Sequence, residues 1–570
     1  MVVNCDIQPP ERPDRTDEPP AVERALDRSA FPQSVASGDP TPEGVLLWTR
    51  VAPGFCDPDA GIAVEVDEAG GRDRRCARFD DPVYRGRLEG APDPVHDHTV
   101  RVDLDGHLDP GNDYHYRFVH AGIASPVGRC RTLPAPGSSP EELTFVLLAC
   151  QDYQNGYYGA LAHAAREEAD FAVHLGDFIY DSADRQYTGL GGRRYPDREV
   201  TLPSGESVAH SLADFRELYR TYRGDRHLQS FAESHTVVRT WDDHAVADNR
   251  FWDYEADAPV LPSHPLGDEP GFAERLTGAG IQAWHEFAPA RVAYDPDADH
   301  LHDAFRLHRS FRFGDLLTLL VTDERLFRSP PPCYGRPFPG FLPAPICPGR
   351  TDPERTMLGR DQRRWLVDRL RGSDTRWTAW ANEVLSLPFD VGVGPASFTP
   401  LIDSWDGYAA ERARLFDAMA RNDRSANLTL TGDLHSSIAG EQRRPDPSVP
   451  RTGPKTTAAE GTGDADERDT GGVVGVELMT PAVTSVNLAE AIGVDEGPLA
   501  GPTRSLLSRA VLGMNPHFDL FDSHHWGYAT VTVGRDDCRY VAYAVDKTVD
   551  TDRAPRRRLA DLRIERDRIV

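Results

Sequence analysis

Apolar and polar positions alternate over short distances in the first quarter of the chain. Between Phe31 and about Leu133, short apolar runs are separated by turns rich in Gly, Pro and Asp, and none has the period of a helix. Closely spaced short strands of this kind predict a β-sandwich of roughly immunoglobulin size. The runs assigned to strands include 45–51, 63–66, 98–102 and 114–120.

The pattern changes after the Pro- and Ser-rich segment 134–140, which we interpret as a linker. Residues 143–149 form a continuous apolar run, as expected of a strand that is covered on both faces. From there strands alternate with helices, which predicts a mixed sheet with helices on both faces, a layered α/β architecture. The further predicted strands are 171–175, 235–241, 316–322, 376–381, 428–431 and 473–478, the predicted helices are 157–168, 212–222 and 355–371, and 528–545 is a predicted β-hairpin.

These patterns divide the 570 residues into two predicted domains, because a single hydrophobic core does not usually grow to this size. The sandwich occupies 30–133 and the α/β domain 141–550, with a disordered tail before them in 1–29. Residues 442–471 are of low complexity and are predicted to form a mobile insertion. Charges alternate in sign towards the end of the chain, which predicts a C-terminal tail or helix in 551–570.

The chain is strongly acidic, which the hydrophobic pattern alone does not show. The chain has 63 Lys and Arg against 91 Asp and Glu, a net charge of −28, and its only lysines are Lys455 and Lys547. Dispersed acidic residues with almost no lysine are typical of a halophilic protein, in which salt screens the repulsion between carboxylates. The alternative is an acidic protein encoded by an arginine-biased genome. In both cases the charge argues against nonspecific binding to nucleic acid or anionic lipid.

Cysteine usage and the N-terminal residues bear on the compartment. The eight cysteines include no CxxC or Cys/His zinc spacing, so a structural zinc site of that kind is not predicted. Cys56 with Cys76, or Cys333 with Cys347, are candidate disulfides, and free thiols are the alternative. No apolar run approaches the ~20 residues of a membrane helix. The first 20 residues lack an export-signal pattern, so we predict a cytoplasmic protein as the sequence stands, and an extracellular or cell-surface one if a leader is missing.

Candidate metal ligands follow four of the predicted core strands directly. The groups are Cys150 after 143–149, Asp177 and Tyr180 after 171–175, Asp242, Asp243 and His244 after 235–241, and Asp433 and His435 after 428–431. The carboxyl ends of strands in an open α/β sheet form its ligand crevice, so these side chains are predicted to converge.

The residue types in this group suit metal ions. Carboxylates, imidazoles, a thiolate and a phenolate bind hard or borderline cations, and a two-metal site hydrolyses phosphoesters by activating water and neutralising the ester oxygens. A bridging carboxylate is then required, for which Asp177 is the candidate. Gly176 and Gly432 are expected to let the backbone turn sharply into each loop. Each motif alone is as consistent with an ordinary turn, but their combination favours a metal site. His174 lies inside a predicted strand and is expected to pack in the core rather than bind metal.

Several longer motifs between about residues 30 and 545 occur together in this chain. They are FPQSVASGDPTPEGVLLWTRV at 31–51, Cys150-Gln151 with Gly156, HLGDFIYD at 174–181, TWDDHAVADN at 240–249, TDERLFR at 322–328, LGRDQRRWLVDRL at 358–370 and TGDLHSS at 431–437. In this combination the sequence resembles the alkaline phosphatase D (PhoD-like) family of the calcineurin-like metallophosphatase fold. The resemblance implies an N-terminal immunoglobulin-like β-sandwich followed by a four-layer αββα metallophosphatase domain.

The resemblance also implies a phosphomonoesterase or phosphodiesterase that uses ferric iron and calcium. The implied iron ligands are Cys150, Asp177, Tyr180 and His435. The implied calcium ligands, with Asp177 shared between the ions, are Asp243 and Asp433, to which we add Asp248 as a candidate carboxylate. His244 would lie beside the phosphate as an acid or electrostatic partner, and Arg325 is a candidate for contacting the substrate phosphate.

The third motif departs from the family pattern, which commonly reads DDHE followed by NN. Here Ala245 replaces the glutamate and Asp248 replaces the first asparagine. Asp248 can still bind a hard cation, whereas Ala245 cannot, so the number and identity of calcium sites stay open.

Two other functions are compatible with the sequence. The first is a phosphodiesterase specialised for phospholipid headgroups or nucleotides, similar in activity to a phospholipase D. The second is a noncatalytic binding protein that uses its β-sandwich, against which the presence of Asp177, Tyr180 and His435 argues. We expect a small-molecule phosphoester as the ligand, no nucleic-acid scaffold and no transmembrane segment, and make no prediction of the oligomeric state.

Overall fold

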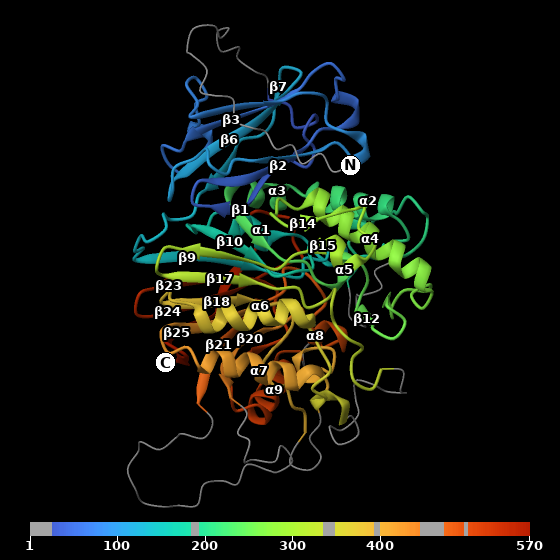
Figure 1. Ribbon diagram of the computed structural model, residues 1–570, viewed down its shortest axis with the longest axis vertical. Helices are drawn as coiled ribbons and strands as arrows, with labels where there is room; N and C mark the ends of the chain where they lie inside the picture. The colour runs from blue at the N-terminus through green and yellow to red at the C-terminus, as the bar shows by residue number, and fades with distance from the viewer. Residues whose placement is uncertain (1–25, 184–192, 335–347, 393–398, 445–471, 495–499) are drawn as a thin grey trace, which may run out of the picture.

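The computed structural model describes residues 26–183, 193–334, 348–392, 399–444, 472–494 and 500–570. The predicted N-terminal tail, apart from 26–29, and nearly all of the predicted insertion at 442–471 lie outside these residues. Within them, two large β-sheets form the centre of the molecule and helices lie on their outer sides (Figure 1). The layered α/β architecture predicted from the sequence is confirmed.

The first large sheet has ten strands and draws on both ends of the chain. Its centre is formed by β9 (Glu142–Leu148), β10 (Phe171–His174) and β11 (Thr236–Arg239), which pair in parallel, as their apolar sequences predict. The strand order is β26-β25-β24-β23-β9-β10-β11-β1-β2-β5. The flanking strands are β1 (Val35–Thr41), β2 (Gly44–Arg50), β5 (Thr99–Asp103), β23 (Gly527–Gly534), β24 (Cys538–Val545), β25 (Arg556–Glu565) and β26 (Arg568–Ile569).

The second large sheet has seven strands in the order β16-β17-β18-β19-β21-β20-β22. Its strands β17, β18, β19 and β21 pair in parallel. Phe145 and Val531 of the first sheet and Leu319 and Leu428 of the second belong to one buried apolar core, so the two sheets pack face to face. The strands are β16 (Arg309–Phe313), β17 (Leu317–Val321), β18 (Trp377–Ala381), β19 (Ala426–Thr431), β20 (Ser437–Arg443), β21 (Val473–Met479) and β22 (Phe518–Asp522).

Helices cover the outer face of each large sheet, which gives four layers. On the first sheet lie α1 (Gly159–Ala164), α2 (Leu212–Arg223), α3 (Arg226–Ser234) and α4 (Pro270–Phe287). On the second lie α6 (Gly359–Gly372) and α7 (Ala409–Ala420), whose Leu366 and Phe416 pack with Trp380 of β18. Shorter elements complete the fold: α5 (Leu301–Ala304), α8 (Leu488–Ala491), α9 (Ala500–Met514), and the two-stranded pairs β12 (Phe251–Asp253) with β13 (Ala258–Val260) and β14 (Ala293–Tyr294) with β15 (Phe305–Arg306).

The N-terminal region is a β-sandwich, as predicted, but one of its two sheets is shared with the α/β domain. A five-stranded sheet packs on β1, β2 and β5, and the core between them includes Val45, Val64 and Phe118. β1 also pairs in parallel with β11. The ten-stranded sheet therefore contains strands from before and after the linker at 134–140. The five strands are β3 (Ile62–Glu68), β4 (Tyr84–Leu88), β6 (Asp113–His120), β7 (Ile123–Ala124) and β8 (Gly128–Arg131).

The prediction of a tail or helix for 551–570 is wrong, because this segment forms β25 and β26 at the edge of the first sheet. Its alternating charges pair across strands rather than along a helix. Arg539 of β24 donates to Asp561 of β25 at 2.7 Å, and Ile564 is buried against the sheet. The predicted hairpin 528–545 is confirmed as β23 and β24.

The two candidate disulfides have different outcomes. Cys56 is a free thiol, so the candidate bridge to Cys76 does not form, whereas Cys333 is disulfide-bonded and its candidate partner Cys347 lies outside the described residues.

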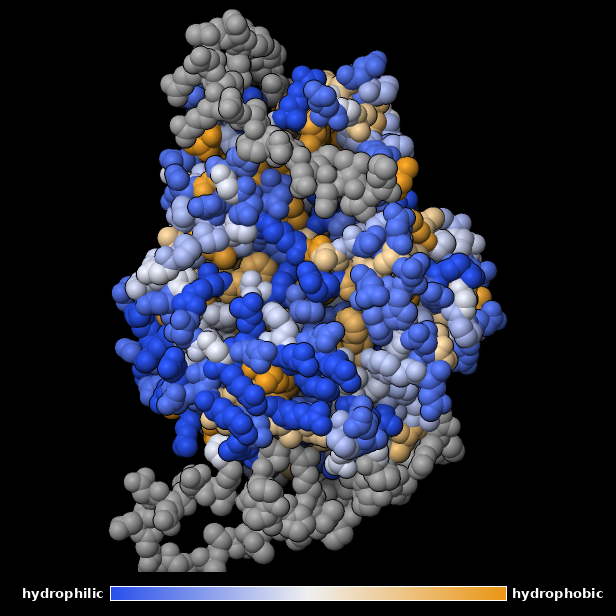
Figure 2. All heavy atoms as spheres, in the orientation of Figure 1, coloured by the Kyte–Doolittle hydropathy of each residue, from blue (hydrophilic) through white to orange (hydrophobic). Residues whose placement is uncertain are grey.

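Among the described helices, none is both long and apolar enough to cross a membrane. Hydrophilic side chains cover most of the face that carries α6 and α7 (Figure 2).

Candidate metal centre

Four of the predicted ligands stand on residues with left-handed backbone, immediately after the core strands. The φ angles are 56° for Cys150, 51° for Asp177, 65° for Asp433 and 51° for His435. A residue with a β-carbon pays roughly 1–3 kcal/mol for such a conformation, which persists where the surrounding structure enforces it and is concentrated at functional sites. The concentration of this strain at the ends of β9, β10 and β19 marks the carboxyl edge of the sheets as the candidate site.

Two glycines allow the strand ends to approach one another. Gly176 has a φ of 107°, and a β-carbon there would lie 2.6 Å from the β-carbon of Asp242. Gly432 needs no unusual φ, but its β-carbon would lie 2.9 Å from that of Ala149 and 3.0 Å from the carbonyl oxygen of Leu175. The expected sharp turn therefore applies to Gly176, whereas Gly432 is required because β19 ends against β9 and β10.

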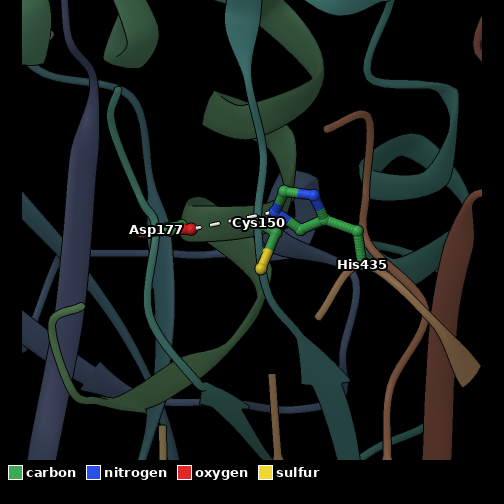
Figure 3. Close-up of side chains that lie close together, drawn as sticks. All are labelled: Cys150, Asp177 and His435. Carbon is green, nitrogen blue, oxygen red and sulfur yellow. Dashed lines mark ion pairs between the residues drawn. The ribbon is translucent and has the colours of Figure 1, made fainter. Parts of the chain in front are cut away.

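The first group of ligands comprises Cys150, Asp177 and His435, whose ligand atoms lie within 4.8 Å of one another (Figure 3). The Nε2 atom of His435 is 4.0 Å from Oδ2 of Asp177. The hydroxyl of Tyr180 lies between them, 3.0 Å from Asp177 Oδ2 and 3.0 Å from His435 Nε2. The four residues predicted to share one ion are thus brought together.

The donor atoms of this first group are arranged as a cation would require. Oδ1 of Asp177 is buried and has no hydrogen-bond partner among the residues that the structure describes. Nδ1 of His435 faces the carbonyl oxygen of Val486 and donates to it, which leaves the lone pair of Nε2 for a metal. Burial raises the pKa of the Cys150 thiol well above its usual value, and neighbouring Asp177 raises it further, so a thiolate here requires a nearby positive charge. The residues present therefore fit a metal ion.

A second group of carboxylates, from Asp242, Asp243 and Asp433, surrounds the guanidinium of Arg325. Arg325 is buried and pairs with Asp242 through Nε, with Asp243 Oδ2 through Nη1 at 3.2 Å, and with Asp433 Oδ1 through Nη2 at 2.6 Å. Nε and Nη2 of Arg325 thus donate to carboxylates, whereas Nη1 lies near Asp243 without a hydrogen bond to any described residue. Asp242 belongs to the candidate group predicted after 235–241, although no ligand role is predicted for it.

His244 is held by a residue that sequence reasoning missed. Its Nδ1 lies 2.7 Å from Oδ1 of Asp181, and its ring lies 4.2 Å from the ring of Tyr180. Burial lowers the pKa of His244, but Asp177, Asp243 and Asp181 together raise it well above the usual range. These carboxylates favour the protonated ring, and the contact with Asp181 orients it.

Asp248 contributes less directly than predicted. Its Oδ2 accepts a hydrogen bond from Ser263 at 2.6 Å, and its Oδ1 lies 3.8 Å from His244 Nε2. It belongs to none of the ligand groups found among the described residues. His174 packs within its strand, as expected, with Nε2 3.3 Å from Oε1 of Gln151.

Comparison with known proteins agrees with this geometry. Residues 145–541 match the family model described as PhoD-like phosphatase, and residues 17–134 match the model of the PhoD-like phosphatase N-terminal domain. The chain is 33% identical over 422 residues to alkaline phosphatase D of Bacillus subtilis (strain 168), a match that covers 72% of the chain and 65% of that relative. A solved structure described as the structure of PhoD superposes with a TM-score of 0.75 at 27% identity, covering 97% of this chain and 93% of that one. The chain therefore belongs to the PhoD-like phosphatase family.

Proposed function

We propose that the protein is a metal-dependent hydrolase of phosphoric esters. The observation that carries the proposal is the convergence of Cys150, Asp177, Tyr180 and His435, with a buried carboxylate oxygen of Asp177 left without a hydrogen-bond partner among the described residues. Membership of the PhoD-like phosphatase family supports the same reaction class. Metal ions in such a site activate a water molecule and neutralise the charge of the phosphate oxygens.

The residues around the first ligand group have separate roles in this proposal. His244, oriented by Asp181, would donate a hydrogen bond or proton to the phosphoester from Nε2. Arg325 would act as a positioning residue through Nε and Nη2, which donate to Asp242 and Asp433. Its Nη1, which makes no hydrogen bond to a described residue, is the atom proposed to contact the substrate phosphate.

Ferric iron is the proposed metal of the first ligand group. Burial raises the pKa of the Tyr180 phenol well above 10, and Asp177 raises it further, so a phenolate forms there only beside a strongly charged cation. Zinc, calcium and magnesium rarely recruit tyrosine, whereas a thiolate from Cys150 adds donor strength for iron.

Calcium is the proposed second metal, on the side of Asp177 that faces Asp243 and Asp433, since carboxylate oxygens are its preferred ligands. Arg325 already neutralises part of this acidic group and occupies one oxygen of Asp433. We therefore expect calcium to be held more weakly than iron and to be removed first by a chelator.

The proposal is tested by elemental analysis of the purified full-length chain together with hydrolysis of p-nitrophenyl phosphate and bis-p-nitrophenyl phosphate. Asp177→Asn keeps the shape of the side chain and should reduce hydrolysis by more than about 100-fold, since even residues that only orient a ligand cost 10–100-fold. Asp299→Asn, an exposed carboxylate, is the control. Chelation should abolish activity and calcium should restore it. Full hydrolysis by protein shown to be free of metal would refute the proposal.

A further inference from the structure

Asp522, His524 and His525 form another group of metal-ligating side chains, separate from the proposed active site. They lie where the chain leaves β22 of the seven-stranded sheet and enters β23 of the ten-stranded sheet. We propose that these three residues bind one divalent ion of the zinc type and thereby fasten the crossover between the two sheets. This site does not depend on the proposed hydrolase activity.

The backbone holds the carboxylate of Asp522 in a ligating position. Its Oδ1 accepts hydrogen bonds from the backbone N–H groups of His524 at 3.2 Å and His525 at 3.1 Å. Its Oδ2 is 2.8 Å from Nδ1 of His525 and 3.2 Å from Nε2 of His524. One carboxylate oxygen thus fixes the turn while the other meets both imidazole rings, so the three donor atoms converge without rearrangement of the chain.

The spacing and type of these donors fit zinc. In a tetrahedral site with bonds of about 2.0–2.1 Å, neighbouring ligand atoms lie roughly 3.3 Å apart. The 3.2 Å contact of His524 with Asp522 is close to that value, and the 2.8 Å contact of His525 would have to lengthen by about 0.5 Å. Two imidazoles and one carboxylate favour zinc over calcium or magnesium, which prefer oxygen ligands. The side chains of His524 and His525 are 16% and 23% exposed, which leaves room for water as a fourth ligand.

Arg557 competes with metal binding at His525. Its Nη2 donates to Nε2 of His525, so Nδ1 carries the proton of the neutral ring and donates it to Asp522. A metal ion at Nδ1 displaces that proton, and the ring then carries its proton on Nε2, which can no longer accept from Arg557. Arg557 is exposed and can turn into solvent, so it weakens metal binding without blocking it.

The group consists of other residues than the proposed active site but lies close to the loop that carries His435. β22 runs in the same direction as β19, and Asp522 pairs with Ser437 at the start of β20, so both groups lie at the same edge of the sheet. β19 and β22 are three strand positions apart, about 14 Å at the usual strand spacing of about 4.8 Å, but His435 is only two residues from Ser437, the partner of Asp522. Iron content is therefore measured in every variant at His524 and His525.

Zinc and cobalt(II) salts are suitable probes, used on the full-length protein with its tightly bound metals retained. After equilibrium dialysis against zinc, we expect one more equivalent in the unmodified chain than in the double variant His524→Ala/His525→Ala. His107→Ala, which removes a partly buried imidazole of the N-terminal region, should retain the full zinc content. Cobalt(II) should give a visible tetrahedral spectrum that is absent from the double variant.

The variant Arg557→Gln is an independent test, because it removes the hydrogen bond that competes with metal binding at His525 and leaves the three proposed ligands unchanged. Zinc should bind this variant several-fold more tightly. Unchanged iron content and thermal midpoint in the double variant would show that it is folded, and a folded double variant with the same zinc content as the unmodified chain would overturn the proposal. Equal or weaker zinc binding by Arg557→Gln would also contradict it.

Discussion

Lys547 is one of two lysines in the chain, and its ammonium group is buried in the α/β domain with a side-chain exposure of 3%. Nζ donates to Oε2 of Glu490 at 2.8 Å and to the carbonyl oxygen of Thr484 at 3.0 Å, and it lies 3.8 Å from the ring centre of Trp526. Lys547→Met keeps the apolar stem against Trp526 but leaves the buried Glu490 carboxylate with Asn155 as its remaining identified partner. Removing one partner of a buried ion pair costs about 3–5 kcal/mol.

The expected change in the thermal midpoint follows from the size of the chain. Unfolding entropy of about 2.1 cal/mol/K per residue amounts to about 1.2 kcal/mol/K for 570 residues, so Lys547→Met should lower the midpoint by about 3–4 °C. The pair also braces the segment that carries Val486, the acceptor for His435 Nδ1, so the variant should lose metal more readily on dialysis.

The control for this prediction is the double variant Lys547→Met/Glu490→Gln. It removes both charges, while the glutamine can still accept from Asn155, so it should recover at least half of the lost stability. A shift below about 1 °C for Lys547→Met would show that the pair is not buried as described. A double variant less stable than Lys547→Met would contradict the reasoning about the unpaired carboxylate.

Three further predictions concern the metal site, the surface and the strand ends. Tyr180→Phe should keep the fold, measured by circular dichroism, but lose or shift the visible charge-transfer band expected of ferric phenolate; a colourless, iron-free and fully active preparation contradicts the metal assignment. The thermal midpoint should rise with potassium chloride, because the net charge of −28 requires screening, and a midpoint that is flat or falls with salt rules out the halophilic interpretation. Gly432→Ala should cost about 1–3 kcal/mol in denaturant unfolding because its β-carbon meets Ala149 and Leu175, whereas Gly54→Ala, with open space around it, should be near neutral; equal effects of the two contradict the packing argument.

The parallel strands of the α/β domain could be predicted closely because they are apolar runs with polar residues at their ends, whereas the more polar β16, β20 and β22 were not predicted. Residues 143–149 were predicted and β9 spans Glu142–Leu148, and 473–478 became β21 at Val473–Met479. The C-terminal strands could not be predicted in this way. Arg556–Glu565 is largely exposed, and such a charged edge strand has the same composition as a surface helix.

The positions of the strand ends also predicted which candidate metal ligands lie close together, but not which charged side chains form ion pairs with one another. Asp181 and His244 are 63 positions apart, and Arg325 and Asp433 are 108 apart. No spacing rule links residues so distant in sequence, because their contact depends on the order of strands in the sheet. The carboxylate partners of Arg325 therefore required the structure.

The parallel pairing of β1 with β11 has a consequence for how the chain can be divided. A fragment that begins after the linker would lack β1, so the backbone N–H and C=O groups of β11 would be unpaired at the edge of the sheet. Such an exposed apolar edge can pair with another copy of the chain. The boundary at which the family models divide the chain is thus not a boundary of folding. A front region transplanted from a relative would have to supply a strand in register with Thr236 and Val237, so the two regions are constrained to evolve as one folding unit.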